Sequence, residues 1–225
     1  MAKHKQSVYQ SISSDPVIRK RVDSWIEQLS GTLKPDRFEH SLSVARTAVH
    51  LSEKHGLDAL RAEQAGLLHD CAKHLSLDEM RQIAVTHSLT SDETILSSRS
   101  LLHSVVGAWY AEKYYGMTDF QVLDAIRYHT TGCAGMSRLS MCICLSDSIE
   151  PLRESYPLLN RIRELAEQSL EQALLLSLES TAGYVTSRGW FLHPQTQETI
   201  RWLKALPETQ EKIILNDKTQ QEEKE

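Results

Sequence analysis

The stretch Ala65-Gly66-Leu67-Leu68-His69-Asp70 decides the fold of this chain and points to its chemistry. An apolar helical segment ends here in an ionisable pair, which is costly to bury unless it is paired or bound to a metal. Asp58 can cap this helix, and the small residues Ala62, Ala65 and Gly66 would let a neighbouring helix approach closely. Adjacent His and Asp side chains point about 100° apart on a regular helix, but at a helix end they can converge on one ion.

Helical signals continue on both sides of this stretch. Apolar spacing, caps and stop residues predict helices over about 17–29, 36–55, 76–85, 101–115, 118–129, 137–150 and 158–180, and a short one before Pro207. Capping-box spacing occurs at Asp36 with Glu39, Ser76 with Glu79, and Thr118 with Gln121. The polar composition of residues 86–100 predicts a loop with one turn of helix. No segment reads as a strand, so the fold class is all-α, a compact helical bundle with a metal site between its helices.

Length and composition favour a single domain with short extensions. The chain has 225 residues, and its 9 Gly and 6 Pro are few for a fold built from many turns. We predict an N-terminal arm over residues 1–16, a single helical domain over 17–207 and a polar C-terminal tail over 208–225. A chain of this length can bury a substantial core without disulfides.

Charge and cysteine content argue against several classes of function. The net charge of −5 gives no support to the broad basic surface of a nucleic-acid-binding protein. No apolar run approaches the roughly 18 residues that span a bilayer, and residues 1–14 lack the apolar core of a signal peptide. The four cysteines form no C-x-x-C pair. We therefore expect a cytoplasmic protein with free thiols and neither a nucleic-acid nor a membrane partner.

Four more ionisable residues stand out by their positions on the predicted helices. His40 falls in the first turn of one helix, His103 near the start of another and His129 at the end of a third. Asp147 lies inside an otherwise apolar helix, where a lone carboxylate needs a partner. Neutral imidazole and carboxylate suit divalent iron, manganese, nickel or zinc. Their order along the chain, together with His69-Asp70, is a much stronger signal than a single His-Asp pair.

This order resembles that of the HD-domain phosphohydrolases, and more closely the YqeK-type symmetrical bis(5′-nucleosyl)-tetraphosphatases. The resemblance covers roughly residues 37–154 and continues more loosely to 202. It is carried by Arg37-Phe38-Glu39-His40, Gly66 to Lys73, Leu102-His103-Ser104, Ala125 to Gly132 and Asp147 to Arg153. The His-Thr-Thr-Gly and Asp-x-Ile-Glu-Pro-x-Arg runs distinguish this family from other HD proteins. Ser146 and Ser148 depart from the expected Ala and Tyr, a change that bears on packing rather than chemistry.

The resemblance implies a hydrolase that splits diadenosine tetraphosphate into two molecules of ADP. It implies a divalent transition metal, with iron as the first choice. The implied metal ligands are His40, His69, Asp70 and Asp147. The implied substrate contacts are Arg37, Lys73, His103, His129, Thr130 and Arg153.

The chemistry of the residues supports these roles. Asp70 could contact substrate and help orient or deprotonate a water, and Lys73, three residues later, could share a helix face with it and bring positive charge to the phosphates. Asp70, Lys73, His103 and His129 are therefore the candidate catalytic residues. Arg37 and Arg153 suit bidentate phosphate contacts, and Thr130, Thr131 and Gly132 could offer hydroxyl and backbone N–H donors.

Three alternative functions stay open on the sequence. The first is another HD enzyme, a nucleotidase or phosphodiesterase acting on a different nucleotide, which would share the ligands without needing both distinguishing runs. The second is a nucleotide-binding regulator that holds its ligand without turnover. A helical nucleic-acid-binding module is the weakest, because the charge balance opposes it. The expected partners are a dinucleoside polyphosphate and ADP, with a homodimer left open.

Overall fold

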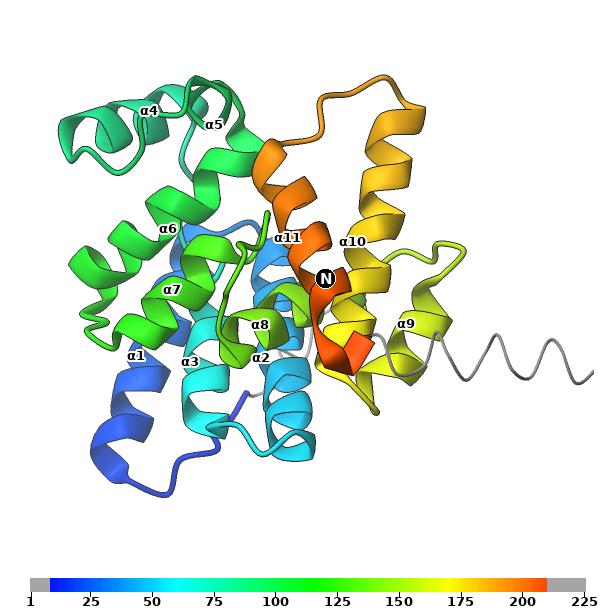
Figure 1. Cartoon of the computed structure of the whole chain (residues 1–225). Helices are drawn as coiled ribbons and strands as arrows, with labels where there is room; N and C mark the ends of the chain where they lie inside the picture. The colour runs from blue at the N-terminus through cyan, green and yellow to red at the C-terminus, as the bar shows by residue number, and fades with distance from the viewer. Residues whose placement is uncertain (1–8, 210–225) are drawn as a thin grey trace, which may run out of the picture.

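Helices make up all the regular secondary structure of residues 9–209, the part of the chain that the computed structural model describes (Figure 1). In chain order they are α1 (Pro16–Thr32), α2 (Pro35–Lys54), α3 (Ala59–Leu68), α4 (Leu77–Thr86), α5 (Glu93–Ser97), α6 (Arg99–Tyr115), α7 (Phe120–Tyr128), α8 (Arg138–Ile149), α9 (Leu159–Ala166), α10 (Leu170–Ser187) and α11 (Pro194–Ala205). The predicted all-α class is confirmed. Within the described range, no helix is long and apolar enough to cross a membrane.

The centre of the molecule is formed by α2, α3, α7 and α8, which pack against one another. The expected close approach at the small residues is present, because a Cβ added to Gly66 would lie 2.7 Å from the Cα of Ala45 on α2. Fully buried Leu42, Leu67 and Ile143 contribute to the core around this contact. The tight contact between α2 and α3 fixes the end of α3, where His69 and Asp70 follow.

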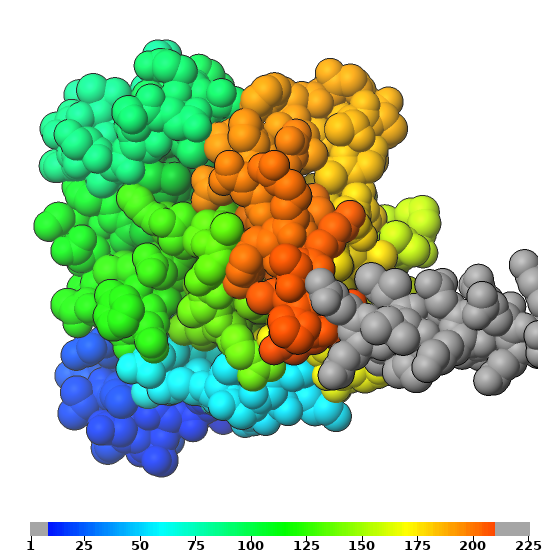
Figure 2. Space-filling view, in the orientation of Figure 1, coloured from blue at the N-terminus to red at the C-terminus, as the bar shows by residue number. Residues whose placement is uncertain are grey.

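Two outer groups of helices flank this centre. A separate apolar cluster joins α4, α5 and α6, with Met80, Ile95 and Leu102 among its buried members. On the other side α10 packs against α8, α9 and α11. Figure 2 shows α11 covering the face between α10 and the segment that contains α6 and α7.

Several predicted helix boundaries hold and two are wrong. Asp58 caps α3, and Ser76 with Glu79 forms the expected capping box of α4. By contrast, α2 begins at Pro35 without a side-chain cap, so Asp36 lies in the first turn instead of capping it. His40 is therefore in the second turn of α2 and not in the first. Asp119, not Thr118, caps α7, because its carboxylate accepts from the backbone N–H of Gln121.

The long helix predicted over 158–180 is two helices. Leu159–Ala166 and Leu170–Ser187 are separated by a short turn, and Ser169 caps the second helix by accepting from the Gln172 N–H at 3.2 Å. Apolar residues continue through the break, so the hydrophobic pattern alone did not reveal it. The turn of helix expected within 86–100 is present as α5, capped by Asp92.

The described part of the N-terminal arm is attached to the domain. Glu63, fully buried on α3, accepts hydrogen bonds from the Tyr9 hydroxyl at 3.2 Å, the Ser11 hydroxyl at 2.8 Å and the Ile12 N–H at 2.9 Å. Three hydrogen bonds satisfy a carboxylate that would otherwise be costly to bury. Residues 9–12 are therefore not loose. Residues 1–8, and the predicted tail from 210 onward, lie outside the described residues.

Candidate metal and phosphate site

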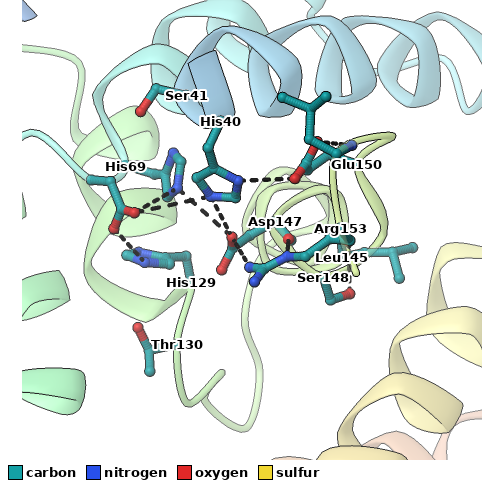
Figure 3. A network of polar contacts seen from close by, with 12 residues as sticks. His40, Ser41, His69, His129, Thr130, Leu145, Asp147, Ser148, Glu150 and Arg153 are labelled. Atoms are coloured by element: carbon teal, nitrogen blue, oxygen red, sulfur yellow. Dashed lines mark hydrogen bonds and ion pairs between the residues drawn. The ribbon is translucent and has the colours of Figure 1, made fainter. Parts of the chain in front are cut away.

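Five segments bring the predicted ionisable residues together. His40 comes from α2, His103 from α6 and Asp147 from α8, while His69-Asp70 and His129 follow the ends of α3 and α7. In Figure 3 the rings of His40, His69 and His129 lie around the space beside Asp147. We call these six residues the carboxylate–histidine cluster.

Asp70 links most of this cluster. Its side chain is 2% exposed, with Oδ2 3.4 Å from His69 Nε2 and Oδ1 3.2 Å and 3.7 Å from Nε2 of His103 and His129. Burial by itself would raise the pKa of Asp70, but the contacts with His69 and His103 hold that pKa well below its usual range. The adjacent His69 and Asp70 converge because the backbone leaves the helix after Leu68, as the sequence suggested.

Backbone carbonyls fix the proton on two of the rings. His69 Nδ1 lies 2.7 Å from the Gly66 carbonyl oxygen, and His129 Nδ1 lies 2.7 Å from that of Ile126. A carbonyl oxygen only accepts hydrogen bonds, so each Nδ1 carries a hydrogen and each Nε2 of the neutral ring offers a lone pair. Burial first, and the nearby His103 and His69 second, lower the pKa of His129 to about 3, so this ring is neutral at neutral pH.

His40 lies between two carboxylates. Its Nδ1 is 3.0 Å from Glu150 Oε1, and its Nε2 is 2.9 Å from Asp147 Oδ1 (Figure 3). Glu150 is 1% exposed. Burial alone would raise the pKa of Glu150, but hydrogen bonds from Ser43, the Leu152 N–H and His40 lower it. Glu150 lies within the Asp147-to-Arg153 run, and no role was predicted for it, although a glutamate between an apolar helix and Pro151 was a usable signal.

The donor set fits a divalent transition metal. Ligand atoms of His40, His69 and Asp147 lie within 4.8 Å of one another, and so do those of His69, Asp70 and His129. Nε2 of His40 and of His69 and Oδ1 of Asp70 are buried without a hydrogen-bond partner. Buried polar atoms are rarely left so, and a cation bound in either group would give such atoms a partner. His129, predicted as a catalytic residue and a substrate contact, also lies at ligand distance.

Three cations border the cluster, and we call them the cationic rim. Arg37 Nη1 lies 2.9 Å from Asp70 Oδ2, Lys73 Nζ lies 3.7 Å from Asp70 Oδ1, and the guanidinium of Arg153 bonds Asp147 Oδ1. Burial lowers the pKa of Lys73, while Asp70 opposes that change. Lys73 lies in a turn after α3, so the helix face predicted for it is wrong although its closeness to Asp70 is real.

His103 and Thr130 extend the cluster. His103 Nε2 lies 2.9 Å from His129 Nε2 and 3.4 Å from the Thr130 hydroxyl. Because His129 Nε2 holds a lone pair, the hydrogen between the two rings belongs to His103 Nε2. Burial lowers the pKa of His103, and Asp70 partly offsets this effect. His103 thus presents an N–H to the centre of the site.

Thr131 and Gly132, predicted as substrate contacts, both contact α11 through their carbonyl oxygens. The Thr131 carbonyl accepts from the Thr199 hydroxyl at 3.2 Å, and the Gly132 carbonyl accepts from Gln195 Nε2 at 2.8 Å. Gly132 has a φ of 64°, and a Cβ there would lie 2.5 Å from Thr199 Cγ2. This glycine is required for the close approach of α11. The sequence did not show which way the turn faces, since that depends on a distant helix.

A cavity of about 160 Å³ lies apart from the cluster. It is lined by residues of α5, α6, α7 and α11, including Leu101, Ser104 and Val105 of α6. At 100° per residue, His103 points about 150° away from that face of α6. The cavity is therefore on the opposite side of α6 from His103 and is not the metal site.

Comparisons with known proteins agree with this geometry. Residues 37–152 match the HD domain, so the chain belongs to the HD domain family. Within that family it is 36% identical over 171 residues to the symmetrical bis(5′-nucleosyl)-tetraphosphatase of Bacillus subtilis, an alignment covering 76% of this chain and 91% of the relative. The enzyme of the same name from Staphylococcus aureus is 34% identical over 172 residues, covering 76% and 88%.

A solved structure gives the same picture. The predicted HD superfamily hydrolase from Clostridium acetobutylicum, described as involved in NAD metabolism, superposes with a TM-score of 0.78 and is 36% identical. The match covers 81% of this chain and 96% of the other. The resemblance drawn from the sequence is confirmed.

Proposed function

We propose that this protein hydrolyses diadenosine tetraphosphate symmetrically, releasing two molecules of ADP. The observation that carries the proposal is Asp70, a buried carboxylate that contacts three histidines and two cations at once. A metal-type donor set beside positive charge suits a polyphosphate. The activity named for the Bacillus subtilis and Staphylococcus aureus relatives supports the choice of substrate.

His40, His69, Asp70 and Asp147 are the residues proposed to hold the metal, and their ligand atoms fall within two overlapping groups that also include His129. A divalent ion bound there would polarise a phosphoryl oxygen and lower the pKa of a bound water. Iron is the first choice, because imidazole and carboxylate donors suit it. Elemental analysis of protein purified without chelator tests this assignment, and absence of a transition metal would contradict it.

The cationic rim is proposed to bind the phosphates. Arg37 and Arg153 pair with carboxylates in the structure, and the planar guanidinium also suits bidentate phosphate contacts. Lys73 adds a point charge beside Asp70. The Thr130 hydroxyl, 3.4 Å from His103 Nε2, is placed to contact the same chain of phosphates.

Proton transfer is assigned to three cluster residues. Asp70 orients the attacking water and can accept its proton, because its two oxygens lie among the histidine Nε2 atoms. His103 holds a hydrogen on Nε2 and can donate it to the departing phosphate oxygen, with His129 beside it as the acceptor that holds the ring in place. Thr131 and Gly132 act indirectly, because their hydrogen bonds to α11 hold the turn that carries His129 in place.

Symmetric cleavage follows if the rim grips one half of the substrate as an ADP unit. The phosphorus beside that unit would then face the cluster. Attack of water there would break the bond between this phosphorus and the gripped ADP, which leaves, while the attacked half becomes the second ADP and carries the oxygen of the water. Hydrolysis in oxygen-18 water, followed by mass spectrometry of the nucleotides, tests this directly. One labelled ADP per cleavage is expected. AMP together with ATP would mean asymmetric cleavage and would reject the proposed substrate geometry.

A further inference from the structure

Glu150 is a buried carboxylate outside the proposed ligand set, and its two oxygens have different partners. Oε1 lies 3.0 Å from His40 Nδ1, while Oε2 accepts from the Leu152 N–H at 2.6 Å. Glu150 is 1% exposed and lies just past the end of α8. One side chain thus joins α2 to the turn that follows α8.

The first contact fixes the proton of His40. An ionised carboxylate only accepts, so Nδ1 of His40 carries a hydrogen. Although Asp147 Oδ1 lies close to it, Nε2 makes no hydrogen bond, so the neutral ring keeps its lone pair there. That lone pair faces Asp147 Oδ1 at 2.9 Å. A lone pair and a carboxylate oxygen at this distance repel each other unless a cation lies beside both. Glu150 therefore prepares His40 to bind a metal.

The second contact shapes the turn that carries Arg153. The Leu152 N–H binds Glu150 Oε2, and the Arg153 N–H binds the Glu150 carbonyl at 3.0 Å. In this turn Arg153 Nε donates to the Asp147 carbonyl at 2.6 Å, and its Nη2 bonds Asp147 Oδ1. Glu150 thereby also sets the position of the arginine that holds the metal-site carboxylate.

We propose that Glu150 is a positioning residue that orients His40 and Arg153 together, so that His40 Nε2 and Asp147 Oδ1 face one metal ion. This inference rests on the proposed metal site. A carboxylate behind a metal-binding histidine fixes its tautomer and strengthens it as a ligand. Here the same carboxylate also connects the histidine to a phosphate-binding arginine.

Glu150→Gln tests the proposal, because an amide has one acceptor oxygen for the three donors Ser43, the Leu152 N–H and His40. The variant should bind iron or zinc about 10- to 100-fold more weakly in a chelator competition. In the metal-free variant at mildly alkaline pH, histidine ¹⁵N NMR should show His40 losing its Nδ1–H form. The wild type should retain that form.

Arg163→Gln is the matched control. Arg163 donates to the carbonyls of Ile149 and Glu150, at 2.8 Å and 2.9 Å, and so supports the same turn without contacting His40. It should lower the melting temperature but leave metal affinity close to wild type. Equal metal loss in both variants, or unchanged affinity and tautomer in Glu150→Gln, would overturn the proposal. A wild type that binds no metal would instead reject the metal site, while the tautomer comparison would still decide the role of Glu150.

Discussion

The carboxylate–histidine cluster and the cationic rim differ in how firmly each is held. In the cluster, His69 and His129 are fixed by backbone carbonyls and His40 by a buried carboxylate. The rim is partly exposed, with side-chain exposures of 36% for Arg37, 22% for Lys73 and 36% for Arg153. Atoms that bind a metal must point in fixed directions. A chain of phosphates can be bound by cations on longer and more mobile side chains.

The largest effect is expected in the cluster. His69→Ala removes a fully buried donor and should lose most of the bound metal, with kcat/KM falling by about 1,000-fold or more. Elemental analysis and a product assay measure the two losses. His50→Ala is the control, because His50 lies on the surface of α2 and pairs with Glu167. Full metal retention in His69→Ala would contradict the assignment of metal binding to the carboxylate–histidine cluster and thus its functional distinction from the cationic rim.

In the rim, Lys73→Ala should lower kcat/KM by about 10- to 100-fold, because charge stabilisation is lost while every proposed ligand stays. Metal content should match the wild type. Lys113→Ala provides the comparison, since Lys113 is an exposed residue of α6. If Lys73→Ala lost its metal, the rim would have to be counted as part of the metal site.

A third prediction concerns Gly132, which lets α11 pack against the turn that carries His129. Gly132→Ala forces both a positive φ and a contact with Thr199, so it should destabilise the fold by about 1–3 kcal/mol in urea denaturation. Gly116→Ala has the same φ class but open space around its Cβ, and should be milder. Thr199→Ala should relieve part of the Gly132→Ala defect. Equal effects at the two glycines would remove the argument for the α11 contact.

The smallest effect concerns the start of α7, the helix whose other end carries His129. Asp119→Ala should cost about 1 kcal/mol at neutral pH, and Thr118→Ala almost nothing. Burial alone would raise the pKa of Asp119, but Arg61 and backbone N–H groups lower it below 3.8.

A lowered folded-state pKa means that the contribution of Asp119 to stability is complete above about pH 4. It disappears as the pH falls through the folded-state pKa. The difference between wild type and Asp119→Ala should therefore shrink between pH 7 and pH 3 in chemical denaturation. If the difference in unfolding free energy between the two proteins did not change with pH, the charge of Asp119 would not contribute to stability.

Local signals in the sequence predicted the helices and most of the cluster. Gly66 predicted the close approach of a neighbouring helix, and the apolar run before His69-Asp70 predicted the burial of this pair. That the neighbouring helix is α2 became clear only in the fold. The break at Ser169 had a local signal that was missed, because Ser169 and Gln172 have the spacing of a helix cap. The direction of Thr131 could not be predicted, because it is decided by packing against the distant Thr199 on α11.

The role of Glu150 was missed for the same reason. Its partner His40 is 110 residues away along the chain, and only the folded α2 and α8 bring them to 3.0 Å. The proposed metal ligands were easier to predict from the sequence, because these residues interrupt apolar segments. The sequence did not indicate which histidine contacts which carboxylate. His129 lies at ligand distance only because the fold brings it close to His69 and Asp70.

His69 and His129 share one more property: each uses the carbonyl three residues before it, at the last turn of its helix. Such carbonyls have no partner inside a helix, so the helix end itself holds the ring. If the last turn of α3 or α7 unwinds, the carbonyl turns away and the imidazole is free to exchange its proton between the two nitrogens. The last turn of α3 contains the fully buried Leu67 and Leu68, so the packing that keeps this helix end wound also keeps Nε2 of His69 available to a metal.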